Sequence, residues 1–298
     1  MTSVAIIVLH FGNAQETFFC LKSLQYISSK IKHKIFVVDN GTKNITIKDL
    51  QQINPKIELI SNKENLGFSE GNNSAIRKGL KENFSHYLLL NNDTMIKKDI
   101  LKKLLPVFSK KSVGIVGCSI VYEKDQKRIW FNGGYINKLF AFTKHRDINK
   151  DITILSGKIK ETDFITGAAM MIKKEVFERI GLLPIEYFLY WEDVDFCYAA
   201  KQNNFLIKIV EEPLVMHKVS SSAGIKGTNV LSPLRAFYYA RNPFIFIKKF
   251  HRPLFLGILG QIAGFIFYIT KVQNKEAAYM YIKGFLKGLA LLFNENLE

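Results

Sequence analysis

A chain of 298 residues with 48% hydrophobic and 23% charged residues is long enough for one large folded domain with an appendage, and this balance excludes an intrinsically disordered protein. The net charge of +16 indicates a polyanionic neighbour, which can be nucleic acid, an anionic membrane surface or a phosphorylated substrate. No nucleic-acid-binding motif occurs, so we expect no nucleic-acid partner, and the three isolated cysteines predict reduced thiols in the cytoplasm rather than a disulfide framework.

The first half of the chain predicts a mostly parallel sheet with helices between its strands. Helical patterns lie at 14–29 and after a polar loop at 65–73. Continuous apolar runs indicate buried strands at 4–9, 34–38, 57–60 and 87–90. Strands that alternate with helices give an α/β fold, whose ligands bind at the carboxyl ends of the strands. Because the chain starts directly with a strand pattern, we expect no signal peptide.

The main chemical signal in this half is Asn91-Asn92-Asp93, at the end of the strand 87–90. A carboxylate fixed at such an edge, with amides beside it, suits a hard divalent cation that takes other ligands from a diphosphate. The alternative is a plain turn, since Asn and Asp are favoured in turns and at helix N-caps. The rest of the chain favours the cation site.

Two other strand ends carry candidate nucleotide contacts. Asp39 can accept hydrogen bonds from a nucleobase or a ribose. Gly67 and Gly71 permit close backbone approach near a helix N-terminus that suits phosphate. Their spacing is not that of a dinucleotide-binding loop, so we do not expect a nicotinamide cofactor. Structural turns explain each of these residues equally well when they are considered singly.

The second half continues the same domain, because no linker-like composition intervenes. It predicts strands at 112–122, 164–172 and 206–210, an irregular hairpin at 128–142, and helices at 174–180 and up to about 203. His217 follows the last of these strands and precedes a loop of small residues. Such a histidine can bind a metal, and such a loop can close over a substrate, although an isolated histidine is more often structural.

Three carboxylates, Glu192, Asp193 and Asp195, follow the aromatic pair Tyr190-Trp191. Mutual repulsion at close range raises the pKa of at least one of them, which suits a proton acceptor. They can also stabilise the N-terminus of the following helix, and the two roles are compatible. The aromatic residues before them predict either a platform for a sugar ring or a core cluster.

In combination these features resemble family 2 glycosyltransferases of the GT-A fold. The resemblance covers about residues 3–250 and is greatest with rhamnosyltransferase-like enzymes of bacterial surface polysaccharide assembly. Two departures occur: His10-Phe11-Gly12 replaces the usual Thr-Tyr-Asn, and Asn91 stands where many members carry Asp, which leaves Asp93 as the main carboxylate ligand. The segments that carry the resemblance are Val38-Asp39-Asn40, Asn65-Leu66-Gly67-Phe68, Gly71-Asn72-Asn73, Leu89-Leu90-Asn91-Asn92-Asp93, Thr166-Gly167-Ala168, Glu192-Asp193-Val194-Asp195 and Arg241-Asn242.

The resemblance implies a GT-A, Rossmann-like domain over residues 1–243, with a mixed, mostly parallel sheet flanked by helices. It implies that Asp93 and His217 bind Mg²⁺ or Mn²⁺, and that Asp193 is the base of an inverting transfer. The 218–232 loop would exclude water. The same resemblance implies that the sugars are bound by Thr166, Gly167, Trp191 and Glu192. It implies that the nucleotide is bound by His10, Phe11, Asp39, Gly67, Asn73, Asn91, Asn92 and Arg241.

The resemblance also implies the substrates. The first expectation for the donor is dTDP-rhamnose, ahead of a UDP-hexose, and for the acceptor a glycan or a polyprenyl-phosphate-linked sugar of cell-surface polysaccharide synthesis. Two alternatives stay open. One is a catalytically inactive GT-A-like protein that binds membranes or nucleic acid, and the other is a nucleotidyltransferase, which would release pyrophosphate.

Residues 244–298 predict a helical extension that associates with a membrane. The segment 253–269 carries no charge, but at about 25 Å as a helix it is short for a bilayer core of about 30 Å. The segment 277–293 is amphipathic and carries Lys283 and Lys287 on one face. We expect peripheral attachment to the cytoplasmic face of the cell membrane, and a soluble, active protein after deletion beyond Phe250. Packing on the catalytic domain and a homodimer interface are the alternatives.

Overall fold

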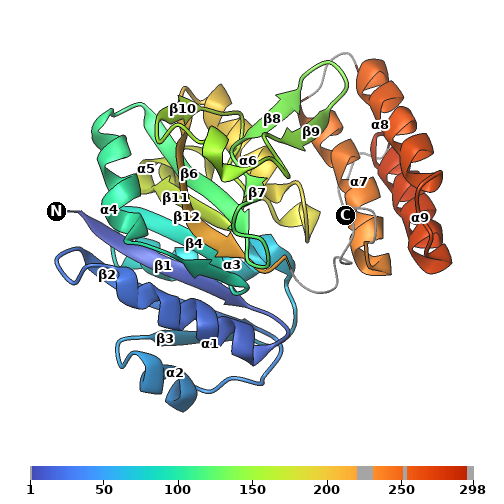
Figure 1. The fold of residues 1–298 in the computed structure, drawn as a ribbon. Coiled ribbons are helices and arrows are strands. Elements are labelled where there is room, and N and C mark those ends of the chain that lie inside the picture. The colour runs from blue at the N-terminus through green and yellow to red at the C-terminus, as the bar shows by residue number, and fades with distance from the viewer. Residues whose placement is uncertain (1, 220–230, 251–253, 294–298) are drawn as a thin grey trace.

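The computed structural model describes residues 2–219, 231–250 and 254–293 (Figure 1). Within these residues one ten-stranded sheet has the order β10-β12-β6-β11-β4-β1-β2-β3, with β5 paired to β12 and β7 paired to β6. Its strands are β1 (Ser3–His10), β2 (Lys32–Asn40), β3 (Glu58–Asn62), β4 (His86–Asn91), β5 (Thr94–Ile96), β6 (Val113–Tyr122), β7 (Ile129–Phe131), β10 (Ile159–Glu161), β11 (Ala169–Lys173) and β12 (Leu206–His217). A separate hairpin pairs β8 (Gly134–Asn137) with β9 (Phe142–His145).

Helices cover the sheet, and three of them form a group at one side of the molecule. Figure 1 shows α7, α8 and α9 together beyond the sheet, with α8 and α9 outermost. The helices are α1 (Ala14–Ser23), α2 (Ile47–Ile53), α3 (Gly67–Lys81), α4 (Ile100–Leu104), α5 (Lys174–Ile180), α6 (Glu192–Gln202), α7 (Pro233–Phe250), α8 (Leu254–Ile269) and α9 (Lys275–Leu291).

The parallel part of the sheet follows directly from the apolar runs in the sequence. All eight residues of β1 are buried, because β1 lies between β2 and β4 and pairs parallel with both. β-branched residues without polar alternation suit a strand that is covered on both faces. The register pairs His10 with Asp39 and Leu9 with Asn91, so the polar ends of β1, β2 and β4 meet at one edge.

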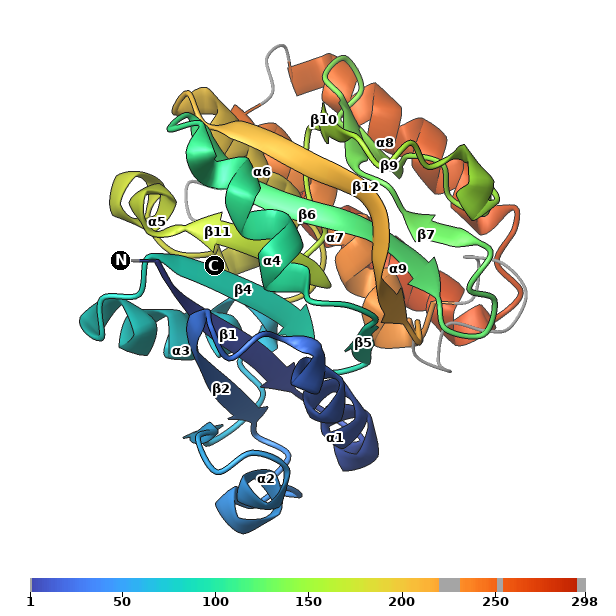
Figure 2. The same ribbon diagram turned by 60° about the vertical axis from the view of Figure 1, so that its left-hand side comes forward.

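The other half of the sheet contains antiparallel pairs, which join the predicted site residues to this edge. β11 lies between β4 and β6 and is antiparallel to both. The predicted strand at 164–172 begins only at Ala169, and Gly167 and Ala168 form a turn before it. The predicted strand at 206–210 continues to His217, because its end pairs with β5. Figure 2 shows this long strand passing in front of β6 and bending toward β5.

The C-terminal helices pack on the sheet domain, as one of the alternatives from the sequence proposed. Phe244, Ile245 and Ile247 of α7 are fully buried in the main core. On α9, Gly284 and Gly288 lie so close to α7 that an added Cβ would clash with the Phe237 carbonyl or the Phe244 ring. Residue 243, the predicted domain boundary, lies inside α7.

α8 packs on α9, where the Tyr268 ring stacks on Tyr281 with 3.9 Å between ring centroids, and it also contacts the turn between β8 and β9. The Gln261 amide donates a 2.7 Å hydrogen bond to the Ala141 carbonyl, and Gly260 lies against the Phe140 carbonyl. Among the helices of the described residues, none combines the length and the apolar character needed to cross a membrane.

Candidate active site

Asp93 and His217 come together because β5 pairs antiparallel with the end of β12. The register places His217 opposite Thr94, and Thr94 directly follows Asp93 in the chain. His217 Nε2 lies 3.0 Å from Asp93 Oδ1, and the two side chains are only 8% and 12% exposed. The Trp130 ring packs edge-on against the imidazole at 4.3 Å between ring centroids. The two residues predicted as metal ligands, 124 positions apart in the chain, therefore form one site.

The donor atoms of this pair fit a hard divalent cation that is shared with a diphosphate. Two ligands at right angles around an ion with bonds of about 2.1 Å stand about 3.0 Å apart, as Nε2 and Oδ1 do here. Within the described ranges, no cluster of three or more His, Cys, Asp or Glu side chains could hold a metal. A Mg²⁺ ion bound through one or two protein side chains usually takes its other ligands from substrate phosphates and waters.

Asp193 lies in the first turn of α6 and faces the turn that precedes β11. Its Oδ2 accepts a 3.0 Å hydrogen bond from Gly167 N, and its Oδ1 accepts one from Val194 N. Burial raises the pKa of Asp193 above its ordinary value, although these backbone donors and Thr166 partly oppose the shift. A carboxylate with a raised pKa is a better proton acceptor than an exposed one.

The same turn connects Asp193 to the end of β4. Asn91 N donates a 3.1 Å hydrogen bond to the Ala168 carbonyl, while Gly167 N binds Asp193. Gly167 is required by packing as well, since an added Cβ would lie 2.6 Å from the Phe68 ring. The residues 166–168 thus place the candidate base next to the strand that leads to Asp93.

The three carboxylates at the start of α6 have different surroundings. Asp195 accepts a 2.6 Å hydrogen bond from the Tyr187 hydroxyl and pairs with Lys249 at 2.7 Å, so it is used within the protein. Glu192 is 5% exposed and its Oε2 has no hydrogen-bond partner among the described residues. Burial and the neighbouring Asp193 raise the pKa of Glu192 well above its ordinary value. Asp193 is therefore the carboxylate best placed to act as a base.

Phe11 and Asn91, two of the predicted nucleotide contacts, lie where a ligand can reach them. Phe11, after the end of β1, is 54% exposed, which leaves its ring free to stack on a planar base. Asn92 donates hydrogen bonds to Thr17 Oγ1 at 3.1 Å and to the Phe11 carbonyl at 3.4 Å, and so fixes the loop that carries this ring. The Asn91 side chain is partly exposed beside them.

Four other predicted ligand contacts are occupied by the protein itself. The buried His10 ring binds Thr17 and Asn44, each at 2.6 Å, and Asp39 accepts three hydrogen bonds from Thr42 and Lys43. Asn73 exchanges two hydrogen bonds with the backbone of Leu183. The close approach at Gly67 is made by the Phe188 carbonyl and ring, not by a phosphate. In the structure these residues therefore shape the site through contacts within the protein. Gly67 is also the first residue of α3, the helix that contains Asn73.

Two more of the predicted contact residues also have partners within the protein. The Trp191 ring is 7% exposed and packs on Phe246 at 5.4 Å, which supports the core alternative over a sugar platform. The Arg241 guanidinium binds the carbonyls of Glu186 and Tyr187, so it stabilises a loop rather than presenting a free cation to a nucleotide.

Asn242 is an important residue that the sequence argument named only as part of a motif. It is fully buried, and its side chain contacts the loop that leads to Asp193. The sequence signal for Asn242 is its amide side chain beside the apolar stretch of α7, because a polar group that is buried there requires hydrogen-bond partners.

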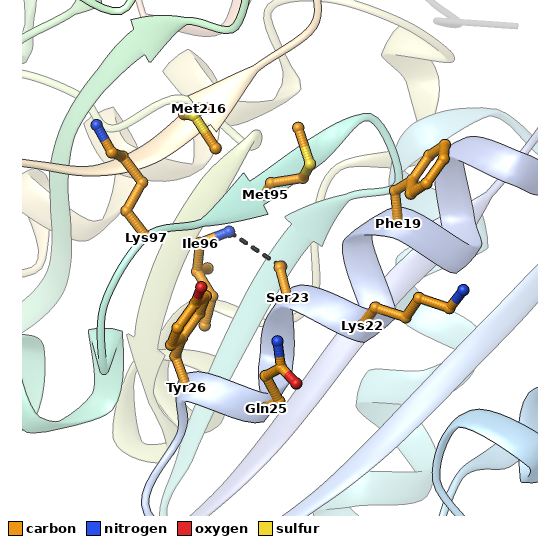
Figure 3. Close-up of a pocket in the computed structure, with 9 residues that line it drawn as sticks. All are labelled: Phe19, Lys22, Ser23, Gln25, Tyr26, Met95, Ile96, Lys97 and Met216. Carbon is orange, nitrogen blue, oxygen red and sulfur yellow. Dashed lines mark hydrogen bonds between the residues drawn. The ribbon is translucent and has the colours of Figure 1, made fainter.

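A separate cavity of about 350 Å³ lies between α1 and the strands β5 and β12 (Figure 3). Phe19 of α1, Tyr26 of the short turn that follows α1, and Met95 and Met216 of the two strands line it. A hydrogen bond between Ile96 N and Ser23 Oγ crosses beside it. None of the predicted site residues contributes to its lining.

Comparison with known proteins agrees with this geometry. The family model described as "Glycosyltransferase like family 2" matches residues 4–229. The chain belongs to this glycosyltransferase family. The glycosyltransferase is 26% identical over 273 residues to "dTDP-rhamnosyl transferase RfbF" of Shigella flexneri, covering 87% of this chain and 88% of that protein. It is 28% identical over 216 residues to "Low-salt glycan biosynthesis hexosyltransferase Agl10" of Haloferax volcanii, covering 70% of this chain and 64% of that one.

The fold of the enzyme also matches a solved glycosyltransferase. A crystal structure of GalNAc-T7 with UDP, GalNAc and Mn²⁺ superimposes with a TM-score of 0.61 at 12% identity. The match covers 99% of this chain and 56% of the GalNAc-T7 chain, so the enzyme spans little more than half of that protein. The expected GT-A fold and membership of family 2 are confirmed.

Proposed function

We propose that this enzyme is an inverting transferase that moves a sugar from a nucleotide diphosphate donor to a hydroxyl of a glycan or a polyprenyl-phosphate-linked acceptor. The observation that supports this most is the turn 166–168, which binds Asp193 on one side and the end of β4, leading to Asp93, on the other. The candidate base and the strand that leads to the candidate diphosphate site are therefore both hydrogen-bonded to one short segment. The name of the Shigella flexneri relative favours dTDP-rhamnose as the first donor to test, ahead of a UDP-hexose.

In this proposal each group has one task. Asp93 and His217 hold Mg²⁺ or Mn²⁺, which would neutralise charge on the leaving diphosphate. The Phe11 ring stacks on the base of the nucleotide. Asp193 takes the proton of the acceptor hydroxyl as that oxygen bonds to the anomeric carbon and the bond from this carbon to the diphosphate oxygen breaks. Attack from the face opposite the leaving group inverts the anomeric configuration.

A binding screen followed by product analysis tests this proposal. Thermal unfolding is measured with dTDP-rhamnose and UDP-hexoses, each with Mg²⁺ or Mn²⁺, because a ligand that binds only the folded state raises its stability. We expect a metal-dependent shift with one donor class, release of the nucleoside diphosphate, and loss of transfer in Asp193→Asn. Release of pyrophosphate would instead identify a nucleotidyltransferase. An absence of any shift, or full transfer by Asp193→Asn, would refute the assignment.

We also propose that the enzyme works at the cytoplasmic face of the cell membrane as a peripheral protein. The helix α8 exposes an apolar stripe at helical spacing, and α9 exposes a second one. Exposed Lys283 and Lys287 lie beside the second stripe, and anionic lipid attracts such residues. The stripes consist of Phe255, Leu259, Ile262 and Ile266 on α8 and Tyr279, Ile282 and Leu286 on α9.

Vesicle sedimentation distinguishes this membrane surface from a homodimer interface. We expect the full chain to bind phosphatidylglycerol vesicles better than phosphatidylcholine vesicles, and Leu259→Gln with Ile266→Gln to weaken that binding while the protein stays folded. Concentration-dependent dimerisation that the same double variant abolishes, without any vesicle binding, would show that the stripes join two copies of the chain.

A further inference from the structure

The loop that precedes the candidate base has a strained backbone. Phe188, Tyr190 and Trp191 have φ values of 61°, 69° and 74°, in the left-handed region that residues with side chains rarely adopt. Trp191 is the N-cap of α6, and its carbonyl accepts the hydrogen bond from Asp195 N that opens the helix. The orientation of the first turn of α6, and of Asp193 within it, therefore depends on this strained conformation.

Asn242 of α7 contacts three carbonyl groups of that loop. Its Nδ2 lies 2.9, 2.7 and 2.8 Å from the carbonyl oxygens of Tyr187, Leu189 and Tyr190. Its Oδ1 accepts a 2.9 Å hydrogen bond from Arg241 Nε, which fixes the orientation of the amide. Both ends of the side chain are thus used, and a strained loop persists only where its surroundings hold it.

Other residues of α7 support the same loop from each side. The Arg241 guanidinium binds the carbonyls of Glu186 and Tyr187. The Phe188 ring stacks on Tyr238 at 4.9 Å, and the Tyr190 ring packs edge-on against Tyr239 at 6.1 Å. Asn242 differs from these neighbours because it alone in this group contacts three carbonyl oxygens of the loop through one fully buried side chain.

We propose that Asn242 is a positioning residue for glycosyl transfer, which holds the 187–191 loop so that Asp193 meets the acceptor hydroxyl. This inference rests on the proposed function of Asp193. It assigns the first C-terminal helix, α7, to the catalytic unit. It also separates two effects: loss of Asn242 displaces the base, whereas Asp93, His217 and Phe11, on other elements, remain in place to bind the donor.

The test is Asn242→Asp, which keeps the shape but places a carboxylate oxygen opposite carbonyl oxygens. Release of dTDP from dTDP-rhamnose, or of UDP from the UDP-hexose that the wild type prefers, is measured with water or an octyl glycoside as acceptor. We expect kcat to fall about 100-fold, as for a catalytic group misplaced by about 1 Å. The donor KM, and the affinity for dTDP or UDP with Mn²⁺, should stay within about twofold of the wild type because uniform binding is unchanged.

Two further variants keep the result interpretable. Leu50→Ala removes a fully buried side chain in α2, a helix that contributes none of the site residues named above, and serves as the control for lost stability. Each protein is assayed well below its own unfolding temperature. If Asn242→Asp does not fold, Asn242→Ser retains one donor on a shorter side chain and should show the same selective fall in kcat.

The outcomes separate this inference from the proposed function. Folded Asn242→Asp or Asn242→Ser with wild-type kcat would refute the positioning role and leave the function of Asp193 standing. An equal fall in kcat in Leu50→Ala, or a parallel loss of dTDP and UDP binding in the Asn242 variants, would refute it as well. If Asp193→Asn itself retains transfer, the proposed function fails first.

Discussion

Deletion of the chain after Phe250 tests whether α8 and α9 are an accessory or part of the folded enzyme. The sequence favours a soluble, active product, but the structure leads us to expect the opposite. Phe244 of α7 is buried and packs edge-on against Phe285 of α9 at 5.1 Å, and Tyr281 and Leu291 of α9 are 6% and 4% exposed. All of these contacts are lost in the truncated protein.

The size of the loss can be worked out from these side chains. Full burial of one large apolar side chain contributes about 1.5–3 kcal/mol. The three buried side chains Phe244, Tyr281 and Leu291 together therefore contribute about 5–9 kcal/mol. The free energy of unfolding of a whole domain is about 5–15 kcal/mol. The truncated protein should therefore aggregate, or unfold at a much lower temperature than the full chain.

Size-exclusion chromatography and thermal unfolding of residues 1–250 give the measurement. The full chain with Leu259→Gln and Ile266→Gln is the matched control, because both side chains are exposed on α8 and their replacement should leave the unfolding temperature unchanged. A monomeric truncated protein that unfolds within a few degrees of the full chain would show that our account of the α7–α9 interface is wrong.

Three further predictions concern single side chains. Asp93→Asn should lower transfer by about 100-fold or more and weaken activation by Mn²⁺, because a metal site supplies several kcal/mol of charge stabilisation. The control is Asp125→Asn, which changes a side chain that is 57% exposed and should alter neither transfer nor activation by Mn²⁺. Because the pKa of Glu192 is raised in the folded protein, its carboxyl group binds a proton more tightly there than in the unfolded chain, where it loses that proton above about pH 4.3. The free energy of unfolding should therefore fall as the pH rises above this value. Glu192→Gln should therefore flatten the dependence of unfolding temperature on pH, and an unchanged slope would contradict the buried, protonated state. Asn73→Ala should lower the free energy of unfolding by about 1–3 kcal/mol, since it leaves the Leu183 backbone groups unpaired; a larger effect on dTDP affinity than on stability would restore its predicted nucleotide role.

Much of the fold is determined locally by the sequence. The runs at 4–9 and 87–90 contain only apolar residues, and such runs can only be strands covered on both faces or parts of a buried helix. The helix at 174–180 is bounded by its own sequence and appears with those bounds. The chemical residues that follow these strands, Asn91, Asn92 and Asp93, are placed at the sheet edge by the same local rule.

The tertiary structure decided which partners the polar residues have. His10 and Asn73 are good ligand donors by type, but Asn44 and Leu183 occupy them, and only the folded chain brings those groups within hydrogen-bond distance. Asp39, by contrast, binds Thr42 and Lys43 within its own turn. A polar side chain carries no sequence signal that tells an internal partner from a substrate, because both satisfy the same donors and acceptors.

The pairing of strands far apart in the sequence was equally beyond local reasoning. Asp93 meets His217 because β12 continues past Pro213 to pair with β5. Asn242 of α7, about fifty residues further along the chain, is hydrogen-bonded to the strained loop before Asp193. The sequence alone determined the class of fold and pointed to the candidate catalytic groups. Their geometry was decided by contacts between segments whose separation along the chain hides them from any local pattern.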